Sequence, residues 1–249
     1  MNKRPITLSI AGYDPSGGAG VLADIKTFEQ HKVAGMAVTT AITYQTEDSF
    51  KAVDWLHYKQ IKGQLKLIIK RYDIKYIKIG LIENLDILYK LLKYLHKKIE
   101  HPYIIWDPIL RASMGYDFKH KIEKKTLKKI LKYCTVITPN WREAEILTKN
   151  KDAIVACNKM AAHCIVFLKG GHNIETPATD MVWEGESLDI LHPDVITNLE
   201  KHGTGCVLSA ALLSNIALGI PFKLSCQLAK NYTLKYILSN NTKLGFHKI

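Results

Sequence analysis

The sequence predicts an α/β fold in which a mostly parallel, doubly wound sheet carries helices on both of its faces. Short runs rich in β-branched residues alternate along the chain with longer stretches of helical period. Glycine, proline and acidic residues follow many of the short runs, as expected where strands end. No Pro-, Ser- or Gly-rich linker divides the 249 residues, so we expect one domain that spans residues 1–249.

The first half of the chain supplies the first strands and helices of this pattern. An apolar run before Gly12 predicts a buried strand, and a loop rich in glycine, proline and aspartate leads from it into a helix. Residues 85–99 have the apolar spacing of an amphipathic helix. In chain order we expect a strand at residues 6–11, a helix at 21–31, a strand at 36–43, a helix at 61–72, a strand at 74–81 and a helix at 85–99.

The second half continues the alternation and closes with two apolar helices. Pro139 ends a short strand, and Glu184, Gly185 and Glu186 form the turn of an expected hairpin. We expect strands at residues 103–109, 135–138, 165–169, 180–183 and 187–191, and helices at 121–132, 143–148, 154–163, 205–218 and 222–238. Ligands of such folds bind beyond the carboxyl ends of the strands, so residues at strand exits are the candidates for chemistry.

The net charge of +12 is carried almost entirely by lysine, since the chain has only four arginines, Arg4, Arg71, Arg111 and Arg142. Lysine pairs such as Lys124 and Lys125 alternate with apolar residues at helical spacing, which indicates the solvated face of a helix. Nucleic-acid readers favour clustered arginine, so we expect no nucleic-acid partner. The positive charge would attract a small polyanion such as a nucleoside triphosphate.

The five cysteines are scattered and show no C-x-x-C spacing, which predicts neither a disulfide framework nor a zinc site. A reducing compartment fits this pattern best. The apolar run near the N-terminus is too short for a signal peptide, and no segment approaches the roughly 20 apolar residues of a membrane span. We therefore expect a cytoplasmic protein with no membrane partner.

Two common nucleotide-binding motifs are missing. The chain has no G-x-x-x-x-G-K-[ST] loop, and Leu208 stands where a G-x-G-x-x-G motif that began at Gly203 would need its third glycine. Two other glycine-rich segments remain, at residues 12–20 and 202–206. Either could be a plain structural feature, a tight turn in the first case and close helix packing in the second.

Both segments also have the composition of ligand-binding loops. Residues 12–20 hold four glycines with Asp14, Pro15 and Ser16 and lead into a helix, which is more than a turn requires. Residues 202–206 open an apolar helix, whose free N–H groups and positive dipole end would bind an anion. That geometry suits the charge that develops on a phosphoryl group during transfer.

These segments occur in order with three further motifs, and together they resemble the hydroxymethylpyrimidine/phosphomethylpyrimidine kinase family of the ribokinase-like superfamily. The resemblance covers residues 6–220 or so and implies a ribokinase-like three-layer αβα fold. The motifs are Ile10-Ala-Gly-Tyr-Asp-Pro-Ser-Gly-Gly-Ala-Gly20, Asp107-Pro108, Thr138-Pro-Asn-Trp-Arg-Glu-Ala-Glu145, Lys169-Gly-Gly-His172 and His202-Gly-Thr-Gly-Cys206.

The resemblance implies that the first glycine loop and the helix after it hold a pyrimidine. Gln45 offers both a donor and an acceptor, as an aminopyrimidine edge needs, although it could equally be an exposed loop amide. Asp24 could instead be a first-turn helix acid near the positive dipole end. The expected substrate-binding residues are Gly12, Ala19, Asp24, Gln45, Leu81 and Ile109.

The resemblance also implies a site for ATP and Mg²⁺ around Asp107, Asn140, Glu143 and Lys169. Asp107 and Glu143 are the expected metal-binding residues, acting through water, because Mg²⁺ prefers one or two carboxylates together with substrate phosphates. Glu143 could also cap its own helix. Lys169 would place a positive charge on the triphosphate, although a lysine at a strand end is often merely solvated.

The resemblance makes Cys206 the expected catalytic base, in the place where sugar kinases of the superfamily carry aspartate. The amides of Gly203, Thr204 and Gly205 would stabilise the transferring phosphoryl group beside it. A helix N-terminus lowers the pKa of a thiol, so we expect some thiolate at neutral pH. The alternative is a small apolar residue that only packs.

Three departures from the family pattern affect substrate preference and closure of the site. Leu81 replaces an expected methionine, Ser113 stands in segment 111–116 where a lysine is usual, and residues 198–201 differ from the polar, threonine-containing stretch that is usual there.

The first hypothesis is ATP-dependent phosphorylation of 4-amino-5-hydroxymethyl-2-methylpyrimidine, and then of its monophosphate, for thiamine diphosphate biosynthesis by a homodimer. The second is a pyridoxal or pyridoxine kinase, because related kinases share the glycine-cysteine motif. The third is a non-catalytic ligand- or nucleic-acid-binding protein on a kinase fold.

Overall fold

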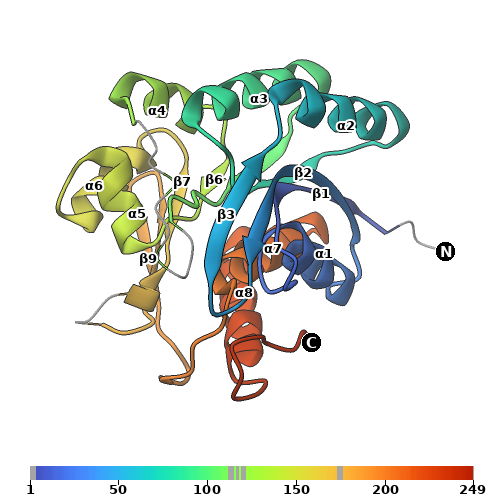
Figure 1. The fold of residues 1–249 in the computed structure, drawn as a ribbon. Coiled ribbons are helices and arrows are strands. Elements are labelled where there is room, and N and C mark those ends of the chain that lie inside the picture. The colour runs from blue at the N-terminus through green and yellow to red at the C-terminus, as the bar shows by residue number, and fades with distance from the viewer. Residues whose placement is uncertain (1–3, 112–114, 116–117, 119–121, 173–175, 249) are drawn as a thin grey trace.

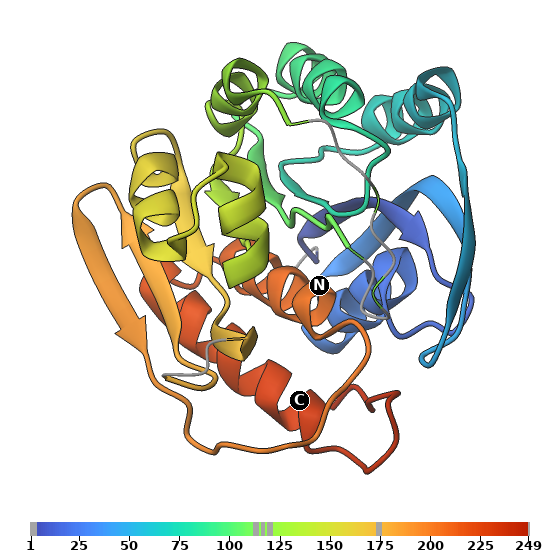
Figure 2. The same ribbon diagram turned by 60° about the vertical axis from the view of Figure 1, so that its left-hand side comes forward.

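The computed structural model describes residues 4–111, 115, 118, 122–172 and 176–248. Within these residues a nine-stranded sheet lies between two layers of helices (Figures 1 and 2). The strand order is β3-β2-β1-β4-β5-β6-β7-β8-β9, and the strands from β2 to β7 in this order are parallel. The antiparallel strands are β3 at one edge and β8 and β9 at the other. The predicted mostly parallel, doubly wound sheet is confirmed.

The strands other than β3 occupy the positions that the apolar runs predicted, with shorter bounds in the centre of the sheet. In chain order they are β1 (Ile6–Tyr13), β2 (Ala34–Gln45), β3 (Phe50–Trp55), β4 (Tyr76–Ile79), β5 (Tyr103–Trp106), β6 (Val136–Ile137), β7 (Ile165–Leu168), β8 (Asp180–Glu184) and β9 (Ser187–Leu191).

The helices divide between the two faces of the sheet because successive strand residues point to opposite sides. On β5, Ile104 and Trp106 pack into one core and Ile105 into the other. The helices over the first core are α2 (Tyr58–Arg71), α3 (Leu85–Lys98), α4 (Lys124–Leu131), α5 (Trp141–Thr148) and α6 (Ala153–Ala161). Those over the second core are α1 (Gly20–Gln30), α7 (Thr204–Ala217) and α8 (Phe222–Ile237) (Figure 1).

The edge hairpin of β2 and β3 is the main difference from the predicted elements. β2 continues past residue 43 to Gln45, which pairs with Phe50 of β3. We expected Gln45 just beyond a strand, and β3 was not predicted at all. Phe50, Val53 and Trp55 are residue types that favour strands, but β3 has no strict alternation of polar and apolar residues, so the local signal was weak.

Helix α7 lies inside the molecule, and nearly every residue from Cys206 to Ala217 is buried. It packs against α1 and α8 as well as the sheet, which explains why it is apolar all round. None of the helices in the described residues has the length and apolar character needed to cross a membrane.

Candidate active site

The loop at residues 12–20 is folded around the carboxylate of Asp14. Asp14 Oδ1 accepts a hydrogen bond from the Ser16 amide at 2.9 Å, and Oδ2 accepts one from the Ala19 amide at 2.8 Å. Gly20 has a φ of 60°, and a Cβ at this position would lie 2.1 Å from the carbonyl oxygen of Gly12. Only glycine allows this closure, so the segment is a built loop rather than a simple turn.

The start of α7 packs directly against this loop. Gly203 has a φ of 76°, and a Cβ on it would lie 2.0 Å from the carbonyl oxygen of Gly18. A Cβ on Gly18 would lie 2.6 Å from Cδ2 of His202. The two glycine-rich segments, far apart in sequence, therefore form one surface.

Residues near the C-terminus hold His202, two residues before the start of α7, by hydrogen bonds. The amide of His202 donates to the carbonyl oxygen of Lys243 at 2.8 Å, and the Tyr236 hydroxyl donates to the carbonyl oxygen of His202 at 3.1 Å. Lys201 Nζ donates to the carbonyl oxygen of Asn240 at 2.6 Å. The phosphate-loop candidate thus depends on residues near the C-terminus.

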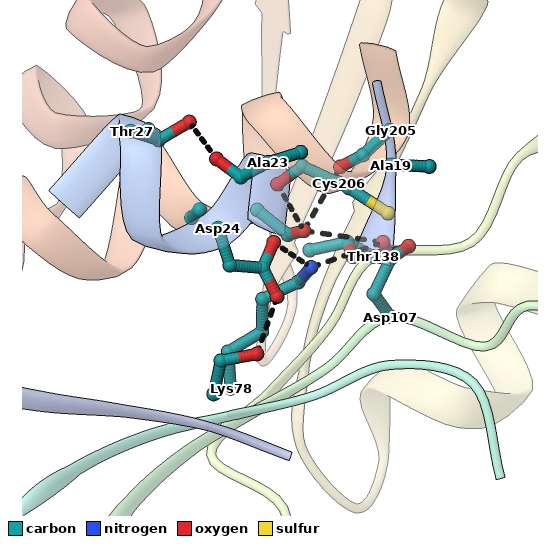
Figure 3. A network of polar contacts seen from close by, with 12 residues as sticks. Ala19, Ala23, Asp24, Thr27, Lys78, Asp107, Thr138, Gly205 and Cys206 are labelled. Carbon is teal, nitrogen blue, oxygen red and sulfur yellow. Dashed lines mark hydrogen bonds and ion pairs between the residues drawn. The ribbon is translucent and has the colours of Figure 1, made fainter. Parts of the chain in front are cut away.

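A line of alternating charges lies at the carboxyl ends of the central strands. Figure 3 shows the part of it formed by Asp24, Lys78 and Asp107. Lys78 Nζ lies 2.5 Å from Asp24 Oδ1 and 4.0 Å from Asp107 Oδ2. Lys169 Nζ continues the line, at 2.8 Å from Asp107 Oδ1 and 3.7 Å from Glu143 Oε2. These five side chains come from α1, β4, the exits of β5 and β7, and α5.

Hydroxyl groups donate further hydrogen bonds to the carboxylates of Asp24 and Asp107. Ser9 donates to Asp24 Oδ2 at 2.6 Å. Asp107 receives hydrogen bonds from Thr138 at 3.2 Å and from Ser209 at 3.1 Å. Every oxygen of both carboxylates therefore has a partner, as a buried charge requires.

The N-terminus of α7 opens onto Lys169 and Asp107. A Cβ on Gly205 would lie 3.1 Å from Lys169 Nζ and 4.0 Å from Asp107 Oδ2. The absence of a side chain at Gly205 leaves the helix amides accessible beside an ammonium group. That arrangement can hold an anion by hydrogen bonds, helix dipole and charge together.

Burial and the neighbouring lysines shift the pKa values of Asp24, Asp107 and Glu143. Burial would raise the pKa of Asp107, but Lys169 and Lys78 hold it below its ordinary value. Burial raises the pKa of Glu143 to about 7, against the opposing effect of Lys169. Burial also raises the pKa of Asp24, and the Lys78 ammonium opposes that rise. The line therefore contains an acid, Glu143, that titrates near neutral pH.

The Cys206 thiol does not behave as the sequence led us to expect. Its sulfur accepts a hydrogen bond from the Gly20 amide, and Lys78 lowers its pKa, but burial outweighs both and raises the pKa to about 11. The expectation of some thiolate at neutral pH is wrong for this structure. The helix N-terminus cannot compensate for a thiol that is only 4% exposed.

Contacts link several of the expected substrate-binding residues or their neighbours. A Cβ on Gly12 would lie 2.9 Å from Leu81 Cδ2, and a Cβ on Gly80 would lie 3.7 Å from Ile109 Cδ1 and 3.9 Å from Lys78 Nζ. Gln45 is half-buried at the end of β2, and among the described residues no hydrogen bond joins its side chain to the others. Its role stays a prediction.

The contacts test the structural alternatives that the sequence left open for Asp24, Glu143 and Lys169. Asp24 is fully buried and lies beyond the first turn of α1, so the first-turn interpretation is wrong. Glu143 does cap its helix, because it exchanges hydrogen bonds of 2.8 and 2.9 Å with Asn140. Lys169 is not merely solvated, since its side chain is 13% exposed and paired. Ser113, one of the noted departures, lies outside the described residues.

Sequence reasoning missed several members of the site. Lys78 was one, although a lysine inside an apolar strand was a visible signal. Asp14 and His202 lay within the motifs but received no role. Ser9, Thr138 and Ser209 gave no signal, because a hydroxyl in a strand or helix is common.

One surface hollow of the described residues lies away from this site. It has a volume of about 610 Å³ and opens at the amino ends of β5 and β6, where its walls are His96, Ile99, Glu100, His101, Pro102, Tyr103 and Thr135. Ligands of doubly wound sheets bind at the opposite edge, so we do not assign the site there.

Comparison with known proteins agrees with the geometry of the site. The family model for phosphomethylpyrimidine kinase matches residues 14–248. The chain is 34% identical to the hydroxymethylpyrimidine/phosphomethylpyrimidine kinase of Aquifex aeolicus over 96% of both chains. It is 32% identical to the enzyme of the same name from Rhizobium meliloti, over 91% of this chain and 88% of that one.

Solved structures give the same fold. Phosphomethylpyrimidine kinase of Clostridium difficile is 31% identical, with a TM-score of 0.77 over 93% of this chain and 99% of that one. An ADP complex of Bacillus subtilis pyridoxal kinase is 28% identical, with a TM-score of 0.81 over 94% of this chain and 92% of that one. The expected ribokinase-like fold and kinase activity are confirmed: the chain belongs to the phosphomethylpyrimidine kinase family.

Proposed function

We propose that this kinase transfers the γ-phosphoryl group of ATP to the hydroxymethyl group of 4-amino-5-hydroxymethyl-2-methylpyrimidine, and then phosphorylates the monophosphate. Both steps belong to the synthesis of thiamine diphosphate. The observation that carries the proposal is the contact between the loop at residues 12–20 and the start of α7, beside Asp107 and Lys169. An alcohol held by the first loop would lie next to an anion site at the second.

The proposed phosphoryl transfer depends mainly on electrostatic stabilisation. The amides at the start of α7 and the Lys169 ammonium face the same space beside Gly205. Negative charge that develops on the transferring group would be stabilised there without reorganisation of the protein. The polar contacts that fix Lys169 are already in place, so its charge is preorganised.

Cys206 is the proposed acceptor of the proton from the alcohol. With a pKa of about 11, roughly one thiol in 10⁴ is ionised at pH 7, so the thiol is a weak base in this structure. The base role therefore requires that bound ligands lower this pKa. The role of the amides does not depend on it.

Mg²⁺ is part of the proposal, with Asp107 and Glu143 as the residues that would hold it. Among the described residues no three side chains of the metal-binding types lie together. The protein would therefore supply two carboxylates, and phosphate oxygens and water would supply the rest. Since Lys169 and hydroxyl groups already occupy the Asp107 oxygens, contact through water fits better than direct ligation. When bound, the ion neutralises charge on the phosphates.

The test is a steady-state assay of the purified protein with ATP, Mg²⁺ and the pyrimidine alcohol, with products identified by ³¹P NMR. We expect a phosphate monoester first and a diphosphate on longer incubation. Asp107→Asn should reduce kcat at least 100-fold. The absence of any phosphorylated pyrimidine, with a correctly folded protein, would contradict the proposal.

Pyridoxal phosphorylation is the second candidate, because several solved structures with the same fold are pyridoxal kinases. Pyridoxal kinase of Staphylococcus aureus, solved in complex with pyridoxal, has a TM-score of 0.82 and 26% identity over 98% of this chain and 93% of that one. Both alcohols should be assayed side by side. A higher kcat/KM for pyridoxal would replace the pyrimidine as the main substrate.

A non-catalytic protein would phosphorylate neither alcohol and would bind DNA or RNA with strong salt dependence. Fluorescence anisotropy with a labelled oligonucleotide measures this directly.

We also propose a cytoplasmic homodimer without a nucleic-acid partner. Ile42 and Tyr44 of β2, which are 45% and 49% exposed, are the apolar side chains that a second copy could cover. Light scattering checks the mass.

A further inference from the structure

Lys78 is a charged residue in the middle of the central strand β4. It pairs in register with Ser9 of β1 and Ile105 of β5, which places all three side chains on the sheet face covered by α1 and α7. Its side chain is fully buried. Burying an ammonium group costs several kcal/mol unless partners compensate for it, so its place in the core calls for a physical explanation.

The carboxylate of Asp24 is within hydrogen-bond distance of the Lys78 ammonium group and has a second partner in Ser9. Nζ lies 2.5 Å from Asp24 Oδ1, while Ser9 holds the other oxygen of the same carboxylate at 2.6 Å. Burial would lower the pKa of Lys78, but the carboxylates of Asp24 and Asp107 raise it. The ammonium therefore stays charged and fixes the carboxylate of Asp24 in one orientation.

The position of Lys78 joins the two halves of the proposed site. On one side lies Asp24, from the helix that follows the first glycine loop, and on the other lies Asp107 at 4.0 Å (Figure 3). A Cβ on Gly80 would lie 3.9 Å from Nζ and 3.7 Å from Ile109 Cδ1, so the ammonium also borders the expected pocket. The other cation of the line, Lys169, contacts Asp107 and Glu143 instead.

The balance between buried carboxylates and ammonium groups in the site explains why Lys78 is needed in addition to Lys169. Three carboxylates face two ammonium groups, and one of the two is Lys78. Without it, Asp24 would be a buried carboxylate with only the Ser9 hydroxyl as a polar partner among the described residues. It would then take up a proton and change from a pure acceptor to a donor.

We infer that Lys78 is a positioning residue of the active site: it holds Asp24 as an oriented, ionised carboxylate on the alcohol side of Asp107. The inference rests on the proposed function for its kinetic consequence only. An ionised Asp24 is an acceptor toward the amino group of an aminopyrimidine, whereas Lys169 serves the phosphates. Loss of Lys78 should therefore affect the alcohol more than the nucleotide.

The first experiment measures stability and needs no activity. Lys78→Met, Asp24→Asn and the double variant are compared with wild type by urea denaturation. Each single variant leaves one buried group without its partner, so both should be less stable, and the double variant should be more stable than the single effects predict. We expect a coupling of at least tenfold in the folding equilibrium constant. Additive effects would overturn the inference.

The second experiment separates a positioning role from a purely structural one. Lys78→Met should raise KM for the alcohol at least tenfold and leave the Kd of an ATP analogue, measured by calorimetry, within threefold. The double variant should recover stability but not KM for the alcohol, because the asparagine that replaces Asp24 is not a carboxylate. If KM recovers together with stability, Lys78 is structural and the inference is wrong.

Lys230→Met provides the matched control. Lys230 Nζ lies 2.8 Å from Asp180 Oδ2 in a second lysine–aspartate pair, with both side chains 10% exposed. This variant should lose stability and keep KM for the alcohol. If it raises KM as much as Lys78→Met does, loss of any such pair is sufficient and Lys78 has no particular role. If wild type phosphorylates neither alcohol, the proposed function fails, and the stability experiment still tests the Lys78–Asp24 pair.

Discussion

His202 Nε2 lies 2.8 Å from Asp14 Oδ2, although 188 residues separate the two in sequence. The same oxygen accepts the Ala19 amide, so one carboxylate organises the first glycine loop and ties it to the residue before Gly203. Nδ1 of His202 has no hydrogen-bond partner among the described residues, so the contact with Asp14 is what anchors the ring. The pair therefore aligns the two loops that the proposed function requires to share one substrate.

Asp14→Asn should destabilise the protein by about 1–3 kcal/mol at neutral pH, because an amide replaces a buried acceptor of several hydrogen bonds. Burial would raise the pKa of Asp14, but His202 and Ser16 hold it below the ordinary value of 3.8. The stabilisation is therefore present above pH 3.8 and is lost as the pH falls through the lower value in the folded state. Urea denaturation from about pH 6 to pH 3 should show the difference from wild type shrinking at the acid end. A constant difference would contradict this account.

Glu143→Gln should flatten the pH dependence of stability between pH 4.5 and about 7, the ordinary and the raised pKa of Glu143. In that interval the folded state holds a proton that the unfolded state has lost, so the stability of wild type falls as pH rises. The decrease should be on the order of 2–3 kcal/mol. Free energies of unfolding from about pH 4 to pH 8 test this, and parallel curves for the two proteins would refute it.

Gly203→Ala should destabilise the protein by about 2–4 kcal/mol and abolish phosphoryl transfer, because the new methyl group meets the Gly18 carbonyl and φ is positive. Gly63→Ala is the matched control. Gly63 lies inside α2 with no atom within 4 Å of the added Cβ, so this variant should be more stable by about 0.5–1 kcal/mol. Thermal melts and kcat of both variants decide the question. A Gly203→Ala protein with normal kcat would show that contact between the loops is not required.

Cys206→Ala should reduce kcat by roughly 10²-fold if the thiol accepts the proton of the alcohol, and should leave the Kd of an ATP analogue unchanged. The helix amides that bind the anion remain in this variant. If kcat stays within threefold of wild type, the base role is wrong and the amides with Lys169 supply the catalysis. Gly205→Ala is the complementary change, because its methyl group would lie 3.1 Å from Lys169 Nζ and block the anion site.

The order of strands and helices could be predicted from the sequence because apolar spacing records which faces are buried. The loop at residues 12–20 could be predicted to be more than a turn, since its four glycines exceeded what a turn needs, whereas the segment at residues 202–206 was left open between an anion site and close helix packing. The pKa of Cys206 could not be predicted. It depends on how deeply α7 is buried between α1 and α8, which is a tertiary property that a local motif does not contain.

The partner of Lys78 also depends on tertiary structure and could not be predicted from the sequence. A lysine in an apolar strand is visible in the sequence, but its partner Asp24 lies 54 residues away on a helix. α1 packs against β1 and β2, and Asp24 on this helix contacts Lys78 on β4, the neighbour of β1, so only the folded chain identifies the pair. Gln45 was misplaced because the extension of β2 depends on pairing with β3, which local pattern alone did not reveal.

The hydrogen bonds from His202 to Lys243 and from Lys201 to Asn240 tie residues near the C-terminus to the proposed phosphate-binding loop. Removal of residues 240–249 by a carboxypeptidase would therefore act as an inactivating event, even though the tail supplies only support to the reacting groups. A purification tag at the C-terminus carries the same risk, and intact mass should be checked before any loss of activity is ascribed to the site itself.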